Sequence, residues 1–179
     1  MAPASIPLAQ IRTRLLRDGL SFARAAQRIP GVVRIALIGS LASPKQAPKD
    51  IDFLVSVADD CDLSALAVAG RQLKGRTQSY NCGADIFLAN EDHSYIGRIC
   101  HWKECRPGVR VSCDARHCGR RAFLHDDLDD VKLDGAVVRA PPIELWPRLH
   151  SFVTTPADVE QLLLSELRAN AYVARPDAA

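Results

Sequence analysis

Two aspartates separated by one residue, Asp50 and Asp52, stand at the head of an apolar run. In a strand, side chains alternate between faces, so the two carboxylates share one face while Ile51 and Phe53 point into a core. Two carboxylates this close repel each other unless a cation lies between them. Magnesium is the usual cation, because it takes hard oxygen ligands and shares them with substrate phosphates. The pattern therefore predicts a half-buried strand with a magnesium site at its start.

Two further runs predict strands on which the same site could be built. Residues 32–38 are mostly β-branched and aliphatic and long enough for a buried strand, and they end at Gly39 and Ser40. There, backbone N–H groups and the serine hydroxyl could face an anion, and the glycine permits close backbone approach. Asp85 lies near the start of a third run, residues 83–89. If that strand lies beside the strand of the two aspartates, Asp85 completes a three-carboxylate cluster.

This ordered set of residues resembles a known family. Gly39 and Ser40, then Asp50 and Asp52, then Asp85 are similar to the motif of the nucleotidyltransferase fold of the DNA polymerase beta superfamily, especially its minimal bacterial members. An isolated Asp-x-Asp carries little information, since many strands begin with such a pair, but the ordered set is far more specific. The alternative interpretation, an ordinary turn and solvated strand ends, requires no function.

The resemblance covers about residues 30 to 90, roughly half of the chain. It implies an α/β (α+β) fold with a small mixed sheet and flanking helices. It also implies a metal-dependent nucleotidyltransferase, which transfers a nucleoside monophosphate from a nucleoside triphosphate to an acceptor hydroxyl and releases pyrophosphate. In such an enzyme Asp50 and Asp52 would hold two Mg²⁺ ions, and Asp85 would be the third metal ligand and a candidate base.

The resemblance also assigns Gly39 and Ser40 to the triphosphate, with one departure from the family pattern. Many minimal members follow Gly-Ser with an Ala-Arg-Gly stretch, whereas residues 41–44 here are Leu-Ala-Ser-Pro. An arginine contact to phosphate is therefore missing at this place. Lys45 or Lys49 could replace its charge, and Lys49 is included among the nucleotide-binding candidates.

Hydrophobic periodicity and turn residues predict the elements around these strands. Pro30-Gly31 should stop the first helix, and Asp62 could cap the second. The sequence predicts helices over residues 6–29, 63–74, 143–149 and 156–172, and a short hairpin over residues 131–138 around Asp134-Gly135.

Composition indicates a normally packed globular chain. Its 179 residues, 47% of them hydrophobic, suffice for one α/β core plus an elaboration, and the net charge of +2 favours no class of partner. We see neither a leader pattern in residues 1–10 nor a membrane-length apolar stretch, so we expect a cytoplasmic protein. In a reducing compartment the six cysteines are not expected to form a disulfide framework.

Four of those six cysteines and two histidines lie within residues 100–118. They form two similar halves, each with two thiols and a histidine between them, and Pro107-Gly108 is a suitable turn between the halves. Tetrahedral zinc needs four thiolate or imidazole ligands. We therefore predict a structural zinc bound by Cys100, Cys105, Cys113 and Cys118, with His101 or His117 as alternative ligands.

Other interpretations of this cluster remain open, because the cysteine pairs are wider than the usual Cys-x-x-Cys knuckle. Buried reduced thiols and redox chemistry are the two alternatives. Cys61 and Cys82 lie outside the cluster and are expected to pack as small hydrophobic residues.

Charge changes sign along the second half of the chain. Residues 98–121 hold seven basic and two acidic side chains, and five aspartates follow within residues 126–134. The basic segment is either a face that guides a phosphate-bearing partner, such as a nucleic acid, or a solvated rim balanced by the acidic run.

We accordingly divide the chain into a nucleotidyltransferase core (residues 1–92), a Cys/His-rich zinc module (93–125) and a C-terminal hairpin with helices packing on the core (126–179). The expected partners are a nucleoside triphosphate and an acceptor, which is a small molecule, an RNA end or a protein; no membrane partner is expected. The alternative function is a non-catalytic nucleotide- or nucleic-acid-binding regulator, such as an antitoxin, on the same fold.

Overall fold

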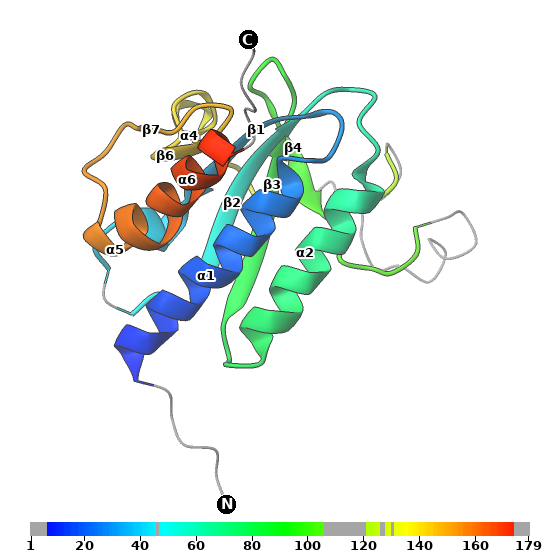
Figure 1. Cartoon of the computed structure of the whole chain (residues 1–179). Coiled ribbons are helices and arrows are strands. Elements are labelled where there is room, and N and C mark those ends of the chain that lie inside the picture. The colour runs from blue at the N-terminus through cyan, green and yellow to red at the C-terminus, as the bar shows by residue number, and fades with distance from the viewer. Residues whose placement is uncertain (1–6, 46, 106–120, 126–127, 130, 174–179) are drawn as a thin grey trace, which may run out of the picture.

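The computed structural model describes residues 7–45, 47–105, 121–125, 128–129 and 131–173 (Figure 1). They form a mixed α/β structure around one sheet. In chain order the elements are α1 (Leu8–Ala26), β1 (Val32–Ile38), the 3₁₀ turn η1 (Gly39–Ala42), β2 (Asp50–Val57), α2 (Leu63–Gln78), β3 (Gly83–Ala89), β4 (Tyr95–Ile99), β5 (Leu124–His125), α4 (Gly135–Arg139), β6 (Ile143–Trp146), β7 (His150–Ser151), α5 (Ala157–Val159), the π-helical segment η2 (Glu160–Leu164) and α6 (Ser165–Val173).

The sheet has seven strands in the order β5-β4-β3-β2-β1-β6-β7. β2 and β3 run parallel, and α2 lies between them in the chain as the crossover that parallel neighbours need. The neighbouring pairs β1–β2, β1–β6, β3–β4, β4–β5 and β6–β7 are antiparallel. The described ends of the segment 93–125 thus contribute β4 and β5 to the same sheet as the core strands.

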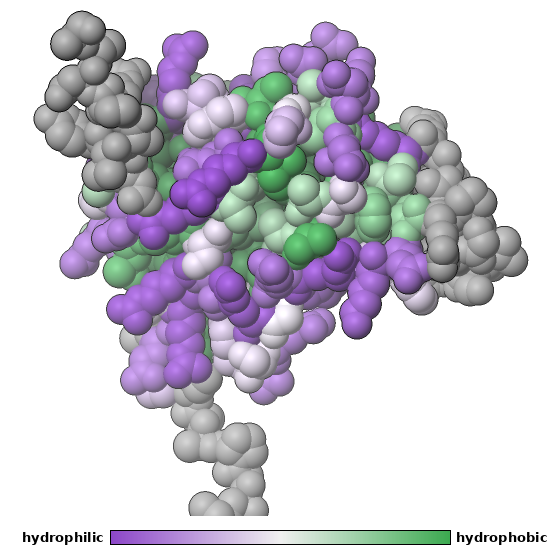
Figure 2. Space-filling model, turned by 45° about the vertical axis from the view of Figure 1, so that its right-hand side comes forward, coloured by the Kyte–Doolittle hydropathy of each residue, from purple (hydrophilic) through white to green (hydrophobic). Residues whose placement is uncertain are grey.

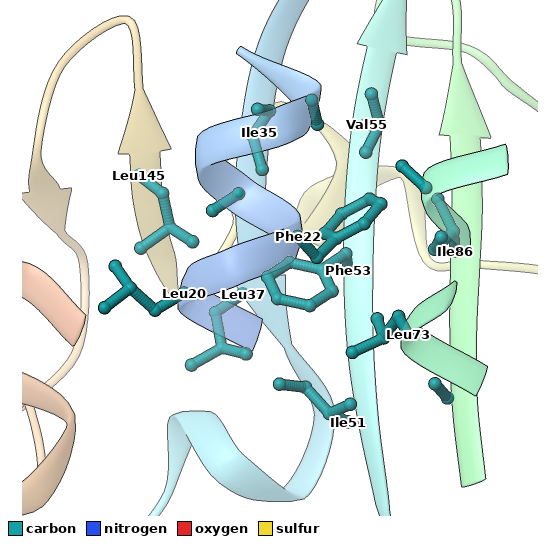
Figure 3. Close-up of a cluster of buried hydrophobic side chains, with 14 of the residues drawn as sticks. Leu20, Phe22, Ile35, Leu37, Ile51, Phe53, Val55, Leu73, Ile86 and Leu145 are labelled. Carbon is teal, nitrogen blue, oxygen red and sulfur yellow. The ribbon is translucent and has the colours of Figure 1, made fainter. Parts of the chain in front are cut away.

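Helices cover one face of this sheet. α1, α2 and the C-terminal helices lie on the same side of it, and their apolar side chains join those of the strands in the main core (Figures 1 and 3). Phe53 is fully buried there and packs against Phe22 with 4.7 Å between ring centroids. The alternation predicted for β2 is confirmed, because Ile51 and Phe53 belong to this core whereas Asp52 does not.

The opposite face has a much smaller cover. A second apolar cluster there contains Ala36, Ile38, Leu54, Ala89 and Val138, the last of which comes from the short helix α4. Strand periodicity places Asp50 and Asp52 on this same face, next to Leu54 in β2. The acidic residues therefore lie on the sheet face that the long helices leave uncovered.

The helices expected in the first half of the chain are confirmed as α1 and α2, and so is the helix expected at its C-terminal end. Asp62 caps α2, since its carboxylate accepts a hydrogen bond of 2.9 Å from the backbone N–H of Ser64. The helix expected over residues 156–172 is present as α5, η2 and α6.

Two expectations for residues 131–149 are wrong. Residues 131–138 do not form a hairpin, because the Asp134 carboxylate accepts from the N–H of Ala136 and so caps helix α4. Residues 143–149 are not a helix but contain strand β6, in which Ile143 and Leu145 are buried in the two-residue period of a strand. The hairpin of this region is instead β6–β7.

The surface is mixed in character. In the view of Figure 2, hydrophilic side chains surround a central band of hydrophobic ones. Among the described residues no helix combines the length and apolar character that crossing a bilayer demands.

Candidate active site

The acid cluster is built by two neighbouring strands. In the parallel ladder of β2 and β3, Asp52 is the register partner of Asp85, so their side chains leave the sheet on the same face. Asp50 lies two residues before Asp52 in β2 and shares that face. The structure thus brings together the three aspartates that the sequence analysis selected.

Asp52 has a strongly raised pKa. Burial, and then the neighbouring charges of Asp50 and Asp85, raise its pKa from 3.8 to about 7. Without a metal ion, the cluster therefore holds a proton on Asp52 through much of the acidic range. A divalent cation would replace that proton and relieve the repulsion between the carboxylates.

Gly39 places the turn after β1 directly against this acid. Its φ is +70°, and a Cβ at this position would collide with Oδ2 of Asp52. Both properties call for glycine. Ser40 follows within η1, and its buried hydroxyl has no hydrogen-bond partner among the described residues. The Gly-Ser turn thus brings backbone and an unused hydroxyl to the edge of the acid cluster.

Arg12 of α1 holds this turn in place, a role that the sequence analysis missed. Its guanidinium donates to the carbonyl oxygens of Leu41 and Lys45, both at 3.0 Å, and pairs with the carboxylate of Asp158. Arg12 is buried. A buried arginine that binds two carbonyls of one turn fixes the course of the chain after Gly39. Only the partners reveal this role, since α1 contains several arginines.

Arg98 of β4 reaches the acid cluster from the other side. Its Nη1 lies 3.3 Å from Oδ1 of Asp85, and the two side chains are 31% and 36% exposed. Arg98 is the register partner of Phe87 in β3, which places it on the face of Asp85. In the sequence Arg98 is distinguished only as part of the basic segment 98–121, because nothing local reveals this cross-strand contact.

Lys49 stands at the entry of β2. Its carbonyl accepts a hydrogen bond of 2.8 Å from the N–H of Gly83, which joins the starts of β2 and β3, and the residue is exposed. Lys45 is also exposed. Both lysines can therefore reach an anion only through flexible, solvated side chains.

The donor set fits a hard divalent cation. Carboxylates from Asp50, Asp52 and Asp85 converge on one face, and oxygen ligands of this kind suit Mg²⁺. In the described part of the chain no three His, Cys, Asp or Glu side chains are grouped as they are around a bound ion. The three aspartates are nevertheless close enough for the charges of Asp50 and Asp85 to raise the pKa of Asp52.

The Cys/His segment lies partly outside the described residues, which exclude Cys113, His117 and Cys118. Its first half folds back on Phe123. The N–H of Phe123 donates to Sγ of Cys105 at 3.2 Å, and the N–H of Cys100 donates to the carbonyl of Phe123 at 2.7 Å. His101 has a buried Nδ1 without a partner among the described residues, and burial, then the charge of Lys74, lowers its pKa to about 4. His101 is therefore a neutral imidazole, the form that binds metals.

Cys61 and Cys82 are buried free thiols, as expected. Burial raises the pKa of both, so they are protonated and poorly reactive at neutral pH.

A pocket of about 620 Å³ lies at the other end of the uncovered face. Arg34 and Ser56, register partners in β1 and β2, line it, and its sides come from the loop after β3 and from the β6–β7 hairpin. Arg34 donates to the carbonyl oxygens of Val138 and Arg139. Arg34 therefore anchors the end of α4 and has a structural role.

Comparisons with known proteins give no match, whether against protein-family models, curated proteins or solved structures.

Proposed function

We propose that this protein is a magnesium-dependent nucleotidyltransferase. The observation that carries the proposal is the pairing of Asp52 with Asp85 across a parallel ladder, directly beside the Gly39-Ser40 turn. The resemblance of the same residues to the DNA polymerase beta superfamily motif supports it.

In this proposal Asp50, Asp52 and Asp85 hold the metal ions, which supply charge neutralisation on the phosphates and align them for in-line displacement. Backbone N–H groups of the Gly39-Ser40 turn and the unpartnered Ser40 hydroxyl bind the triphosphate. The acceptor oxygen bonds to the α-phosphorus, the bond from that phosphorus to pyrophosphate breaks, and Asp85 takes the acceptor's proton. Few residues suffice, because phosphoryl transfer needs mainly positioning and charge stabilisation.

A structural zinc in the Cys/His segment remains part of the proposal. The N–H···Sγ bond from Phe123 to Cys105 is the kind of contact that orients a metal-bound thiolate. His101, neutral with a buried Nδ1 that has no partner among the described residues, suits the place of a fourth ligand beside the cysteines.

The Arg98–Asp85 ion pair favours a second candidate, a non-catalytic nucleotide-binding regulator on the same fold. The Arg98 guanidinium partly compensates the charge of the carboxylates even without a metal ion. The presence of the three aspartates is therefore not by itself evidence of catalysis. Metal-dependent chemistry, rather than binding, separates the two candidates.

The test measures pyrophosphate release from each of the four nucleoside triphosphates with Mg²⁺ and pooled cellular RNA, proteins or metabolites as acceptors. We expect release in one pool, its loss in EDTA, and its loss in Asp85→Ala. Magnesium-dependent nucleotide binding without pyrophosphate release in any pool would reject the nucleotidyltransferase and favour the non-catalytic regulator.

A further inference from the structure

Arg98 is the cation best placed to serve the acid cluster. Its Nη1 contacts Asp85 at 3.3 Å from the neighbouring antiparallel strand, and about a third of each side chain is exposed. Both groups therefore face solvent on the uncovered side of the sheet, where a ligand of Asp85 would also arrive. An exposed ion pair of this kind is weak and exchanges partners easily.

The turn after β1 supplies no such cation. Residues 41–44 are Leu-Ala-Ser-Pro, and Leu41 and Ala42 are buried. Arg12, which lies next to the turn, already binds Leu41, Lys45 and Asp158 through its guanidinium. The side chains of Lys45 and Lys49 are solvated. Arg98 is thus an arginine on the acid face whose contact with Asp85 is partly exposed and can be exchanged without breaking the core.

We infer that Arg98 holds Asp85 in the metal-free protein and moves to a phosphate of the triphosphate when the metal-bound nucleotide enters. This inference rests on the proposed function and adds a phosphate-binding residue to that site. A guanidinium offers paired N–H donors that match phosphate oxygens, so the exchange replaces one carboxylate partner with a more highly charged one.

If Arg98 changes partner in this way, Arg98→Met should change the affinity for Mn²⁺ and the affinity for the Mn²⁺–triphosphate complex in opposite directions. Arg98 competes with a cation for Asp85, so its removal should strengthen binding of Mn²⁺ alone, by about 3- to 10-fold for one weak ion pair. Arg98 also binds phosphate, so its removal should weaken binding of an Mn²⁺–triphosphate complex by about 10- to 100-fold. Arg98→Lys should give intermediate values, since lysine keeps the charge and loses the paired donors.

The experiment titrates Mn²⁺ by electron paramagnetic resonance, and then titrates the four α,β-methylene nucleoside triphosphates at saturating Mn²⁺. It compares the wild type, Arg98→Met, Arg98→Lys and the control Arg24→Met. The control removes a different arginine ion pair, between Arg24 and Glu166 at 3.0 Å, on the side of the sheet that the helices cover. The control should leave both affinities unchanged. Thermal unfolding shows whether every variant is folded. If Arg98→Met does not fold, the two affinities are compared between the wild type and Arg98→Lys instead.

Opposite shifts in Arg98→Met, with wild-type values in the control, support the inference. Tighter Mn²⁺ binding with unchanged nucleotide affinity overturns it, because Arg98 is then only a counter-ion of Asp85. Weakening of both affinities in a folded variant also overturns it, because Arg98 then only maintains the cluster. Absence of Mn²⁺ and nucleotide binding in the wild type rejects the proposed function itself, and this inference with it.

Discussion

Asp52 and Asp85 are register partners in the parallel ladder between β2 and β3, so their side chains leave the sheet on the same face, the one that α1 and α2 do not cover. α2 is the crossover that makes this pairing possible. The acid cluster therefore depends on one β2–α2–β3 unit, to which β1 adds the Gly39-Ser40 turn.

Asp52→Asn should stabilise the metal-free protein at pH 8. The pKa of Asp52 is raised from 3.8 to about 7, so the folded state binds a proton more tightly than the unfolded chain between those values. The stability that this group contributes is therefore present at low pH and is lost as the pH rises through about 7. The gain at pH 8 should be on the order of 2 to 4 kcal/mol and should shrink toward pH 5. Urea unfolding in EDTA at both pH values measures this gain, and destabilisation of Asp52→Asn at pH 8 would contradict a raised pKa of Asp52.

Gly39→Ala should destabilise the protein by about 1–3 kcal/mol, because alanine is strained at positive φ. The new Cβ would also push against Oδ2 of Asp52, so Mn²⁺ affinity should fall. Gly75→Ala is the control, since Gly75 lies in α2 with open space around it. That change should instead stabilise the protein by about 0.5–1 kcal/mol. Equal effects of the two substitutions would refute the special role of Gly39.

Arg12→Met should cost about 2–4 kcal/mol of unfolding free energy, because it leaves Asp158 and two carbonyl oxygens without their buried donor. It should also weaken nucleotide binding by loosening the Gly39-Ser40 turn. Arg24→Met removes a more exposed ion pair that also joins α1 to the C-terminal helices, and should cost under about 1 kcal/mol. Denaturant unfolding compares the two variants, and a smaller loss of unfolding free energy in Arg12→Met than in Arg24→Met would contradict the role of Arg12 in holding the turn.

The purified protein should contain about one zinc per chain, as a closed four-ligand structural site does. Elemental analysis and native mass spectrometry test this. Cys105→Ser should lose the metal, whereas Cys82→Ser, which alters a buried thiol elsewhere, should retain it. Metal-free protein with thiols that react fully with Ellman's reagent would exclude the zinc site.

Much of the acid cluster could be predicted from the sequence, because its determinants are local. The two-residue period of β2 fixes which face Asp50 and Asp52 share, and the apolar character of residues 83–89 identifies β3 as the strand of Asp85. Gly39 at a strand end also marks a turn that needs positive φ.

Long-range contacts could not be predicted in the same way. Arg12 and Arg98 are indistinguishable in sequence from other arginines, because their roles come from partners 146 and 13 residues away. Asp134-Gly135 is compatible with both a hairpin turn and a helix start, and the Asp134 carboxylate selects the helix. Pro147 and the alternation of Ile143 and Leu145 with polar or partly buried neighbours could have indicated a strand in place of the expected helix.

Equilibrium dialysis of labelled nucleoside triphosphates against the wild type and Asp52→Asn is the most direct test of the metal and triphosphate site. We expect the wild type to retain nucleotide with Mg²⁺ and to release it in EDTA, while folded Asp52→Asn retains little under either condition. Equal nucleotide retention by the two proteins, or nucleotide retention that does not depend on Mg²⁺, would contradict a metal and triphosphate site at Asp50, Asp52 and Asp85.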